Sequence, residues 1–118
     1  IAFDKKNKTL IQIEEIFKKF DFIILPSSQV FPFNKNIQYP KKINEQELDT
    51  YHRWLEVFII SSLFDLPTLT VPIGFNDTGS PMGLQIIAKK GDDIKLLSFA
   101  KTYEKIYKYS NIKAKFKL

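Results

Sequence analysis

The clearest pattern along the chain is an alternation of apolar and other residues on either side of a short polar segment. Every second residue is apolar in 69–75, and the same spacing returns in 82–88. A period of two is typical of β-strands, and the intervening Asn76–Gly79 has the composition of a tight reversal. We therefore expect a β-hairpin at the centre of residues 66–93.

Three residues of this hairpin predict where it departs from a regular ladder. Pro72 has no N–H to donate, so we expect it at a sheet edge or at a bulge. Gly74 and Gly83 fall near the turn on opposing strands. The lack of a Cβ at these two positions permits close packing.

An apolar stripe at helical spacing predicts a helix over Thr9–Phe20. Thr9 followed by Gln12 fits a capping box at its start. The short apolar run after it, Phe22–Leu25, ends at Pro26 and predicts a strand covered on both faces, as in an α/β sandwich. The helical stripe consists of Leu10, Ile13, Ile16, Phe17 and Phe20.

Two further helices are expected. Leu48–Phe64 is polar in its first turn and apolar on most faces from Trp54 onward, which predicts a buried helix. The last helix starts at Gly91-Asp92-Asp93, where Asp92 or Asp93 can cap it and favour its dipole. Its expected buried stripe is Leu96, Leu97, Ala100, Tyr103 and Tyr107.

A long irregular segment over residues 26–47, from Pro26 to Glu47, and a lysine-rich tail over 109–118 complete the chain. Loops of this length are often functional. Ser27 and Ser28 directly follow a strand end, where α/β proteins place ligand contacts. The alternative is that both hydroxyls only cap the turn. The tail alternates lysine with apolar residues and is either a short strand or a frayed end.

Composition narrows the function classes. The chain has no cysteine, which excludes disulfides and thiolate metal sites. Its net charge of +5 comes almost wholly from lysine, whereas nucleic-acid readers usually use arginine as well, so we expect no nucleic-acid partner. No apolar run approaches the roughly 20 residues that span a bilayer, and no leader pattern opens the chain. We therefore expect no membrane partner and a cytoplasmic location.

Three runs carry a resemblance to a known family: Leu-Pro-x-x-x-Val-Pro-x-Gly-Phe in 66–75, Pro-x-Gly-Leu-Gln-Ile-Ile in 81–87, and Gly-Asp-Asp in 91–93. They resemble the C-terminal part of the amidase signature family, whose members are serine amidohydrolases. The resemblance covers nearly the whole chain and implies an α/β fold, the C-terminal part of an α/β/α sandwich with a mixed β-sheet. Because the first residue is Ile rather than Met, we expect either a processed chain or a fragment, and the resemblance favours residues 1–118 as a C-terminal fragment of an amidase domain.

The resemblance implies that the parent enzyme, the longer protein of which this chain would be a part, hydrolyses a carboxylic amide to an acid and ammonia or an amine. In the family a serine attacks the carbonyl and is activated through a second serine in a cis peptide and a lysine. Backbone N–H groups stabilise the oxyanion, and no metal or cofactor takes part. No Gly-Gly-Ser-Ser-Gly run occurs in this chain. We therefore expect the catalytic residues upstream, the chain alone to be inactive, and its role to be completing the sheet and walling one side of the substrate pocket.

The run Asp-Thr-Tyr-His-Arg-Trp, which ends at Trp54, resembles a subgroup of plain amidases rather than the A subunits of tRNA-dependent amidotransferases. The resemblance implies that Tyr51, His52 and Trp54 line the pocket for a small-molecule amide, and Ser28 is a further substrate-binding candidate. The alternative for His52 is a hydrogen-bonded packing role. No metal-binding spacing accompanies this histidine, so no metal site is expected.

Two other function classes stay open. An amidotransferase A subunit would need partner subunits and tRNA. A non-catalytic binding module would use the basic surface of the chain. A homodimer of the parent enzyme is left open as well.

Overall fold

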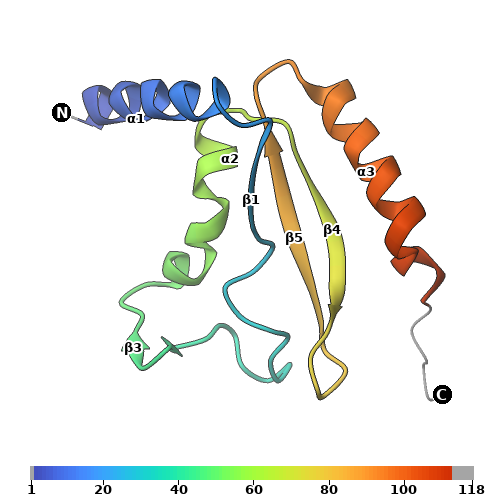
Figure 1. Cartoon of the computed structure of the whole chain (residues 1–118). Helices are drawn as coiled ribbons and strands as arrows, with labels where there is room; N and C mark the ends of the chain where they lie inside the picture. The colour runs from blue at the N-terminus through green and yellow to red at the C-terminus, as the bar shows by residue number, and fades with distance from the viewer. Residues whose placement is uncertain (1, 113–118) are drawn as a thin grey trace.

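The structure, a computed structural model, describes residues 2–112 of the chain. Helices lie around a small sheet whose central strand runs through the middle of the molecule (Figure 1). In chain order the elements are α1 Ala2–Phe17, β1 Phe22–Pro26, β2 Lys42–Ile43, β3 Gln46–Glu47, the 3₁₀ helix η1 Tyr51–Phe58, α2 Ile59–Leu63, β4 Thr68–Phe75, β5 Pro81–Ala88, α3 Asp93–Tyr107 and the 3₁₀ turn η2 Tyr109–Asn111.

β5 is the central strand of the main sheet, in the order β1-β5-β4. Both neighbours run antiparallel to it, with Phe22 opposite Ala88 and Leu69 opposite Ile86. Helices packed on this sheet are compatible with the expected α/β class. The expected mixed sheet is not seen among the described residues. A short turn joins β4 to β5 and permits only antiparallel pairing, and β1 also pairs antiparallel with β5.

The predicted hairpin is confirmed, together with its irregularity. Ile73 has no partner in β5, so a bulge lies between Pro72 and Gly74. Pro72 therefore sits both on an edge strand and beside a bulge, as a residue without an N–H requires. Gly74 has a φ of +132°, which residues with a side chain rarely adopt. The turn closes where the Asn76 side chain accepts the N–H of Ser80 at 2.8 Å.

The two faces of the sheet carry different helices. Alternation along β5 directs Leu84, Ile86 and Ala88 toward α3. Gln85 and Ile87 point to the opposite face, where η1 lies. The core on the α3 side consists of Val71, Ile86, Ala88 and Leu96, with Phe22, Leu69, Leu84, Phe99 and Tyr103 packed around it.

α1 begins earlier than its apolar stripe indicated. It starts at Ala2, and Thr9, the predicted cap, lies in its middle, where its hydroxyl donates to the carbonyl of Lys5 at 3.0 Å. The capping-box prediction was wrong because the lysine-rich residues before Thr9 are adequate helix formers without an apolar face. Of the stripe, Ile13 is buried whereas Ile16 is 40% exposed.

The second expected helix is shorter and partly of another type. Leu48 still belongs to the preceding extended segment, since its N–H bonds the carbonyl of Lys41. The helical turns start at Tyr51 with η1 and continue as the short α2. Its apolar faces are covered only in part, because Ile59 and Leu63 are 50% and 46% exposed whereas Phe64 is buried.

α3 matches its predicted start and only part of its predicted buried face. Leu96 is buried, but Leu97 and Tyr107 are exposed. The helix meets the sheet with Leu96 and Tyr103, two turns apart on one side, and Leu97 lies about 100° around the axis from Leu96. Asp92 occupies the N-cap position, but its side chain makes no capping hydrogen bond.

The loop and the tail differ in part from expectation. Residues 26–47 are not wholly irregular, because β2 and β3 pair in a small hairpin. Its turn residues Asn44 and Glu45 have φ values of 47° and 64°. In the tail, Tyr109–Asn111 forms one 3₁₀ turn. The rest of the predicted tail, residues 113–118, lies outside the described residues.

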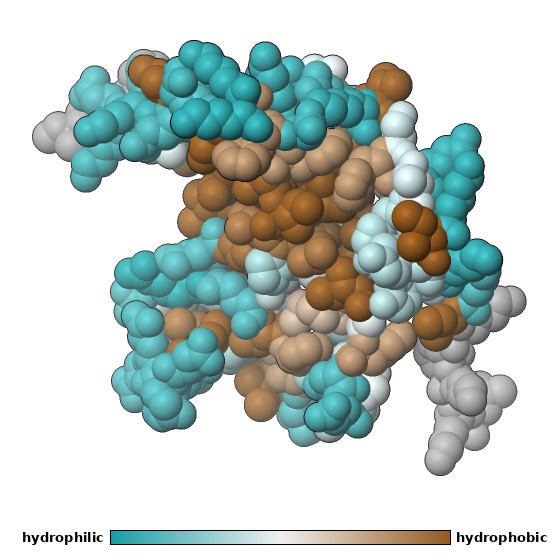
Figure 2. Space-filling model, viewed as in Figure 1, coloured by the Kyte–Doolittle hydropathy of each residue, from teal (hydrophilic) through white to brown (hydrophobic). Residues whose placement is uncertain are grey.

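Much apolar surface stays uncovered. Ile24 of β1 is 49% exposed, so the strand expected to be covered on both faces is open on one. Figure 2 shows hydrophobic atoms gathered over the middle of the visible face, where Figure 1 places α2 and β1. The radius of gyration is 16.8 Å, whereas a compact domain of this length has about 13–14 Å. Exposed apolar surface of this kind is typical of an interaction face.

We predict that residues 1–118 alone do not fold as a cooperative monomer. The apolar faces of α2 and β1 would remain in water, and such patches favour association. Light scattering after size exclusion, combined with a thermal melt, should give aggregates or a broad transition. A sharp, reversible transition of a monomeric species would contradict this prediction.

Candidate functional site

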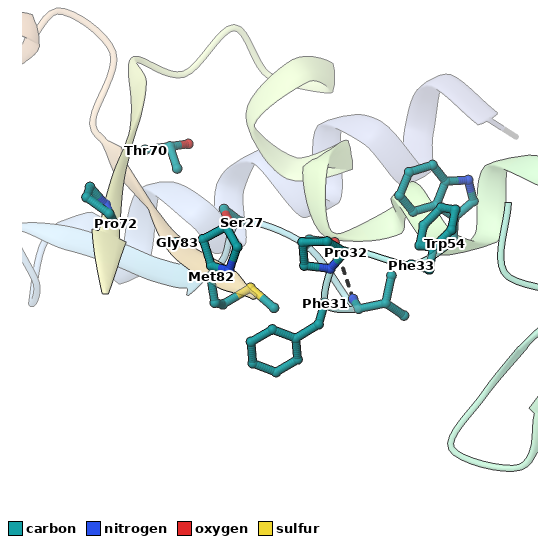
Figure 3. A pocket seen from close by; sticks show the side chains of 12 residues that line it. Ser27, Phe31, Pro32, Phe33, Trp54, Thr70, Pro72, Met82 and Gly83 are labelled. Atoms are coloured by element: carbon teal, nitrogen blue, oxygen red, sulfur yellow. Dashed lines mark hydrogen bonds between the residues drawn. The ribbon is translucent and has the colours of Figure 1, made fainter. Parts of the chain in front are cut away.

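A groove lies beyond the carboxyl end of β1, between the β4–β5 hairpin and the start of η1. Its volume is about 500 Å³, within the range of small-molecule sites. Figure 3 shows the residues of β4 and β5 on one side and the loop aromatics with Trp54 on the other. The lining consists of Ser27, Ser28, Val30, Phe31, Pro32, Phe33, Trp54, Thr70, Pro72, Pro81, Met82 and Gly83.

Gly83 lies at a closely packed point in the floor of the groove. The N–H of Ser27 donates to the carbonyl of Gly83 at 2.8 Å and so extends the β1–β5 pairing beyond the end of β1. A Cβ on Gly83 would lie 2.8 Å from Ser27 Oγ and 3.0 Å from Thr70 Cγ2. The expectation that Gly83 permits close packing is therefore confirmed.

Ser28, a predicted substrate-binding residue, lines the groove and is half-buried. Its Oγ accepts the N–H of Val30 at 3.2 Å, which is the local turn bond of the alternative interpretation. A hydroxyl that accepts one bond still has its own O–H to donate. Ser28 can therefore close the loop and bind a ligand at the same time, and its contact with a substrate stays a prediction.

Trp54 supplies the largest ring of the lining. It packs edge-on against Phe33 with ring centroids 5.8 Å apart, so η1 and the loop meet at this side of the groove. Its Nε1 is buried, and none of the described residues accepts its N–H. Because a buried indole N–H usually has an acceptor, this donor is available to a ligand or to another part of a longer protein.

Tyr51 and His52 lie outside the groove lining. The Tyr51 ring contacts Trp54 and Tyr39 edge-on, at centroid distances of 6.1 and 5.3 Å. The His52 ring lies against Tyr51 at 5.6 Å. The structure thus brings Ser28 and Trp54 together at the groove and leaves Tyr51 and His52 in an aromatic cluster next to Trp54. Direct substrate contact by these two residues stays a prediction.

A set of polar contacts holds the start of η1. The Arg53 guanidinium pairs with Asp49 at 2.9 Å and with Glu56 at 2.6 Å. The hydrogen bond from Arg53 holds the pKa of Asp49 below its usual value. These side chains are exposed, so their pairs add little stability. The Arg53 carbonyl accepts the side-chain N–H of Gln29 at 2.7 Å, which links the groove loop to η1.

The lining is apolar with a few hydroxyls. It contains no acidic residue, histidine, lysine or arginine, so Ser27 and Ser28 have no neighbouring general base to activate them. Within residues 2–112, no cluster of His, Cys, Asp or Glu side chains is arranged to hold a metal ion. The groove can therefore bind a ligand by area and shape, but it does not contain the groups that activate a nucleophile.

A profile of the Amidase family matches residues 2–97. The chain belongs to the amidase family. The resemblance in the hairpin runs is thereby confirmed. No solved structure matches the chain significantly, so the family assignment rests on sequence. None of the helices in residues 2–112 is long and apolar enough to cross a membrane.

Several curated relatives within the family are named as the A subunit of glutamyl-tRNA(Gln) amidotransferase. The protein of Sulfolobus acidocaldarius is 33% identical over 105 residues, covering 87% of this chain and 20% of the relative. That of Thermodesulfovibrio yellowstonii is 37% identical over 101 residues, covering 82% and 19%. That of Borreliella burgdorferi is 30% identical over 98 residues, covering 81% and 19%. The chain thus spans about a fifth of the length of these relatives.

Gln85 joins two segments that flank the groove, and it is not among the residues that the sequence predicts for the site. It is 1% exposed, and its Nε2 donates to the carbonyls of Pro26 at 3.0 Å and Val57 at 2.8 Å. Pro26 precedes Ser27, and Val57 follows Trp54 by one turn of η1. Gln85 is the one amide among the apolar residues of β5, and this contrast was the sequence signal that could have identified it.

We predict that Gln85→Met destabilises the protein by about 2–4 kcal/mol, because the carbonyls of Pro26 and Val57 lose the donor that a buried side chain supplies while the side-chain volume stays similar. The matched control is Gln12→Met on the exposed side of α1, which should change stability by less than about 0.5 kcal/mol. Urea denaturation of the longer protein that carries this chain measures both. Equal stabilities of the two variants would show that the Gln85 amide does not hold these segments.

Proposed function

We propose that this chain is a C-terminal part of an amidase-family enzyme that breaks the C–N bond of a carboxamide, and that it forms one wall of the substrate site. The supporting observation is a groove with an apolar lining, two serine hydroxyls and no charged side chain, in a chain of this family. Such a lining suits a ligand recognised by shape and a few hydrogen bonds.

The catalytic serines and lysine that the family resemblance implies would come from another part of the longer protein. The groove residues supply neither a base nor an activated nucleophile. We therefore propose that residues 1–118 alone hydrolyse no amide. The family mechanism calls for no metal or cofactor, and none is proposed.

Two forms of this function are supported by different observations. The groove lining favours a stand-alone amidase acting on apolar small-molecule amides, because free glutamine carries an ammonium and a carboxylate that no lining side chain would pair. The name shared by the relatives favours the second candidate, the A subunit of a glutamyl-tRNA(Gln) amidotransferase that works with partner subunits and tRNA. Neither the structure nor the relatives support a homodimer, and none is proposed.

Ammonia release by the longer protein distinguishes the two forms. We expect the purified protein alone to release ammonia from aryl and medium-chain aliphatic amides faster than from glutamine. Alanine substitution of the family's nucleophilic serine is the control for contaminating activity. Release from glutamine only, and only with partner subunits and glutamyl-tRNA(Gln) present, would instead identify the amidotransferase.

Trp54→Ala tests the groove as the substrate wall. We predict a loss of about tenfold in kcat/KM for bulky amides and little loss for the smallest, because the ring contributes contact area that only a large substrate uses. Phe75→Ala, which removes an exposed ring outside the lining, is the control. Rates are normalised to folded protein. Equal fractional losses across the amide series would make Trp54 a packing residue and remove the groove from the substrate site.

A further inference from the structure

The bulge in β4 is held by two tyrosine hydroxyls that come from the far end of the described chain. Tyr103 Oη donates to the carbonyl of Pro72 at 2.8 Å. Tyr109 Oη donates to the carbonyl of Ile73, also at 2.8 Å. Two consecutive carbonyls at the irregular point of the strand thus each receive a side-chain donor. Pro72 is a lining residue of the groove.

The bulge is a place where β4 depends on outside support. Ile73 is skipped in the pairing with β5, and Pro72 cannot donate a backbone hydrogen bond. β4 is also an edge strand among the described residues, so no further strand holds it from its other side. The backbone position of Pro72 is therefore set by fewer ladder bonds than that of a residue in a regular central strand.

The two tyrosine rings that carry these hydroxyls both pack against a third ring, that of Tyr107. Tyr107 lies between the other two tyrosines, with ring centroids 4.5 Å from Tyr103 and 6.1 Å from Tyr109. Lys108 adopts a left-handed conformation, with a φ of 52°, which ends α3 and turns Tyr109 back toward β4. Both hydroxyls thus come from one continuous segment, the end of α3 and η2.

The Tyr103 hydroxyl remains a donor over the working range of pH. Burial, with a smaller contribution from nearby Tyr109, raises the pKa of Tyr103 above its ordinary value. The protonated form is therefore the one present at neutral and mildly alkaline pH, and only this form can donate to Pro72.

We infer that Tyr103 and Tyr109 are positioning residues that fix Pro72 in the groove wall and so determine which sizes of amide the groove accepts. The inference rests on the proposed function of the groove as the substrate wall. The hydroxyls touch no substrate and act only through the backbone of β4. Without them the bulge can shift, and the wall that Pro72 forms loses its fixed place.

The test uses Tyr103→Phe, Tyr109→Phe and the double variant in the longer protein. Tyr107→Phe is the matched control, because it removes a hydroxyl from the same stack that makes no bond to the bulge. For the double variant we expect the ratio of kcat/KM between bulky and small amides to change about three- to tenfold, chiefly through KM. Tyr107→Phe should leave this ratio unchanged.

Amide hydrogen exchange supplies a readout that does not depend on activity. In each single variant, exchange at Ile73 and Gly74 should quicken about fivefold, as the loss of one neutral hydrogen bond implies, while Ile86–Ala88 in β5 stay protected. Equal quickening throughout the sheet would indicate a general loss of stability and overturn the inference. Unchanged exchange at Ile73 and Gly74 would overturn the inference as well.

Trp54→Ala, measured in the same amide series, separates this inference from the proposed function. If Trp54→Ala changes the size preference and the tyrosine variants do not, the groove is the substrate wall and the inference is wrong. If Trp54→Ala leaves the preference unchanged, the proposed function fails, and the inference as a statement about substrate size fails with it. Exchange at the bulge then shows whether the hydroxyls hold β4 for packing alone.

Discussion

The groove depends on one buried amide group. The buried side chain of Gln85 donates two hydrogen bonds. A polar group left without a partner in such a buried place would lower the stability of the fold. Its two acceptors belong to segments 59 and 28 residues away along the chain. By satisfying both, the amide fixes the end of β1 and the turn of η1 at one separation, and the groove is the space this leaves. Its own Oε1 is buried without a donor among the described residues, so it can receive one from elsewhere in a longer protein.

The parts of the fold that the sequence predicts are those that short-range patterns determine. Alternation and turn residues suffice for the β4–β5 hairpin, and Pro72 alone indicates an edge or a bulge. The start of α1 was missed because a polar helix turn has no periodicity to detect. The exposure of Leu97 was missed for another reason. Which side of an apolar helix is covered depends on what it packs against, and the described residues cover only part of the apolar surface that the pattern marks.

The candidate site shows the same division. Ser28 was found because a strand end is a local feature, and Trp54 because of a motif. Helical spacing alone places Tyr51 and Trp54 on one face and His52 to the side. The sequence could not tell that only Trp54 of this pair lines the groove, since this depends on how η1 lies against the sheet. The 3₁₀ form of η1 has three residues per turn, so Tyr51 stands over Trp54 and their rings meet. The hydrogen bonds from Tyr103 and Tyr109 to β4 could not be predicted from the sequence either, because they join residues 31 and 36 positions apart.

The close packing at Gly83 makes one part of the groove harder to change than the rest. A methyl group at Gly83 would lie 2.8 Å from Ser27 Oγ and 3.0 Å from both Thr70 Cγ2 and the Val71 carbonyl oxygen, so an alanine there requires these neighbours to move. Phe31, Phe33 and Met82 reach the groove from a loop and from a strand end. Single substitutions at this rim can reshape the opening while the floor beneath stays the same. A new substrate preference, evolved or engineered, is therefore reached more readily by changes at the rim than by a change at Gly83.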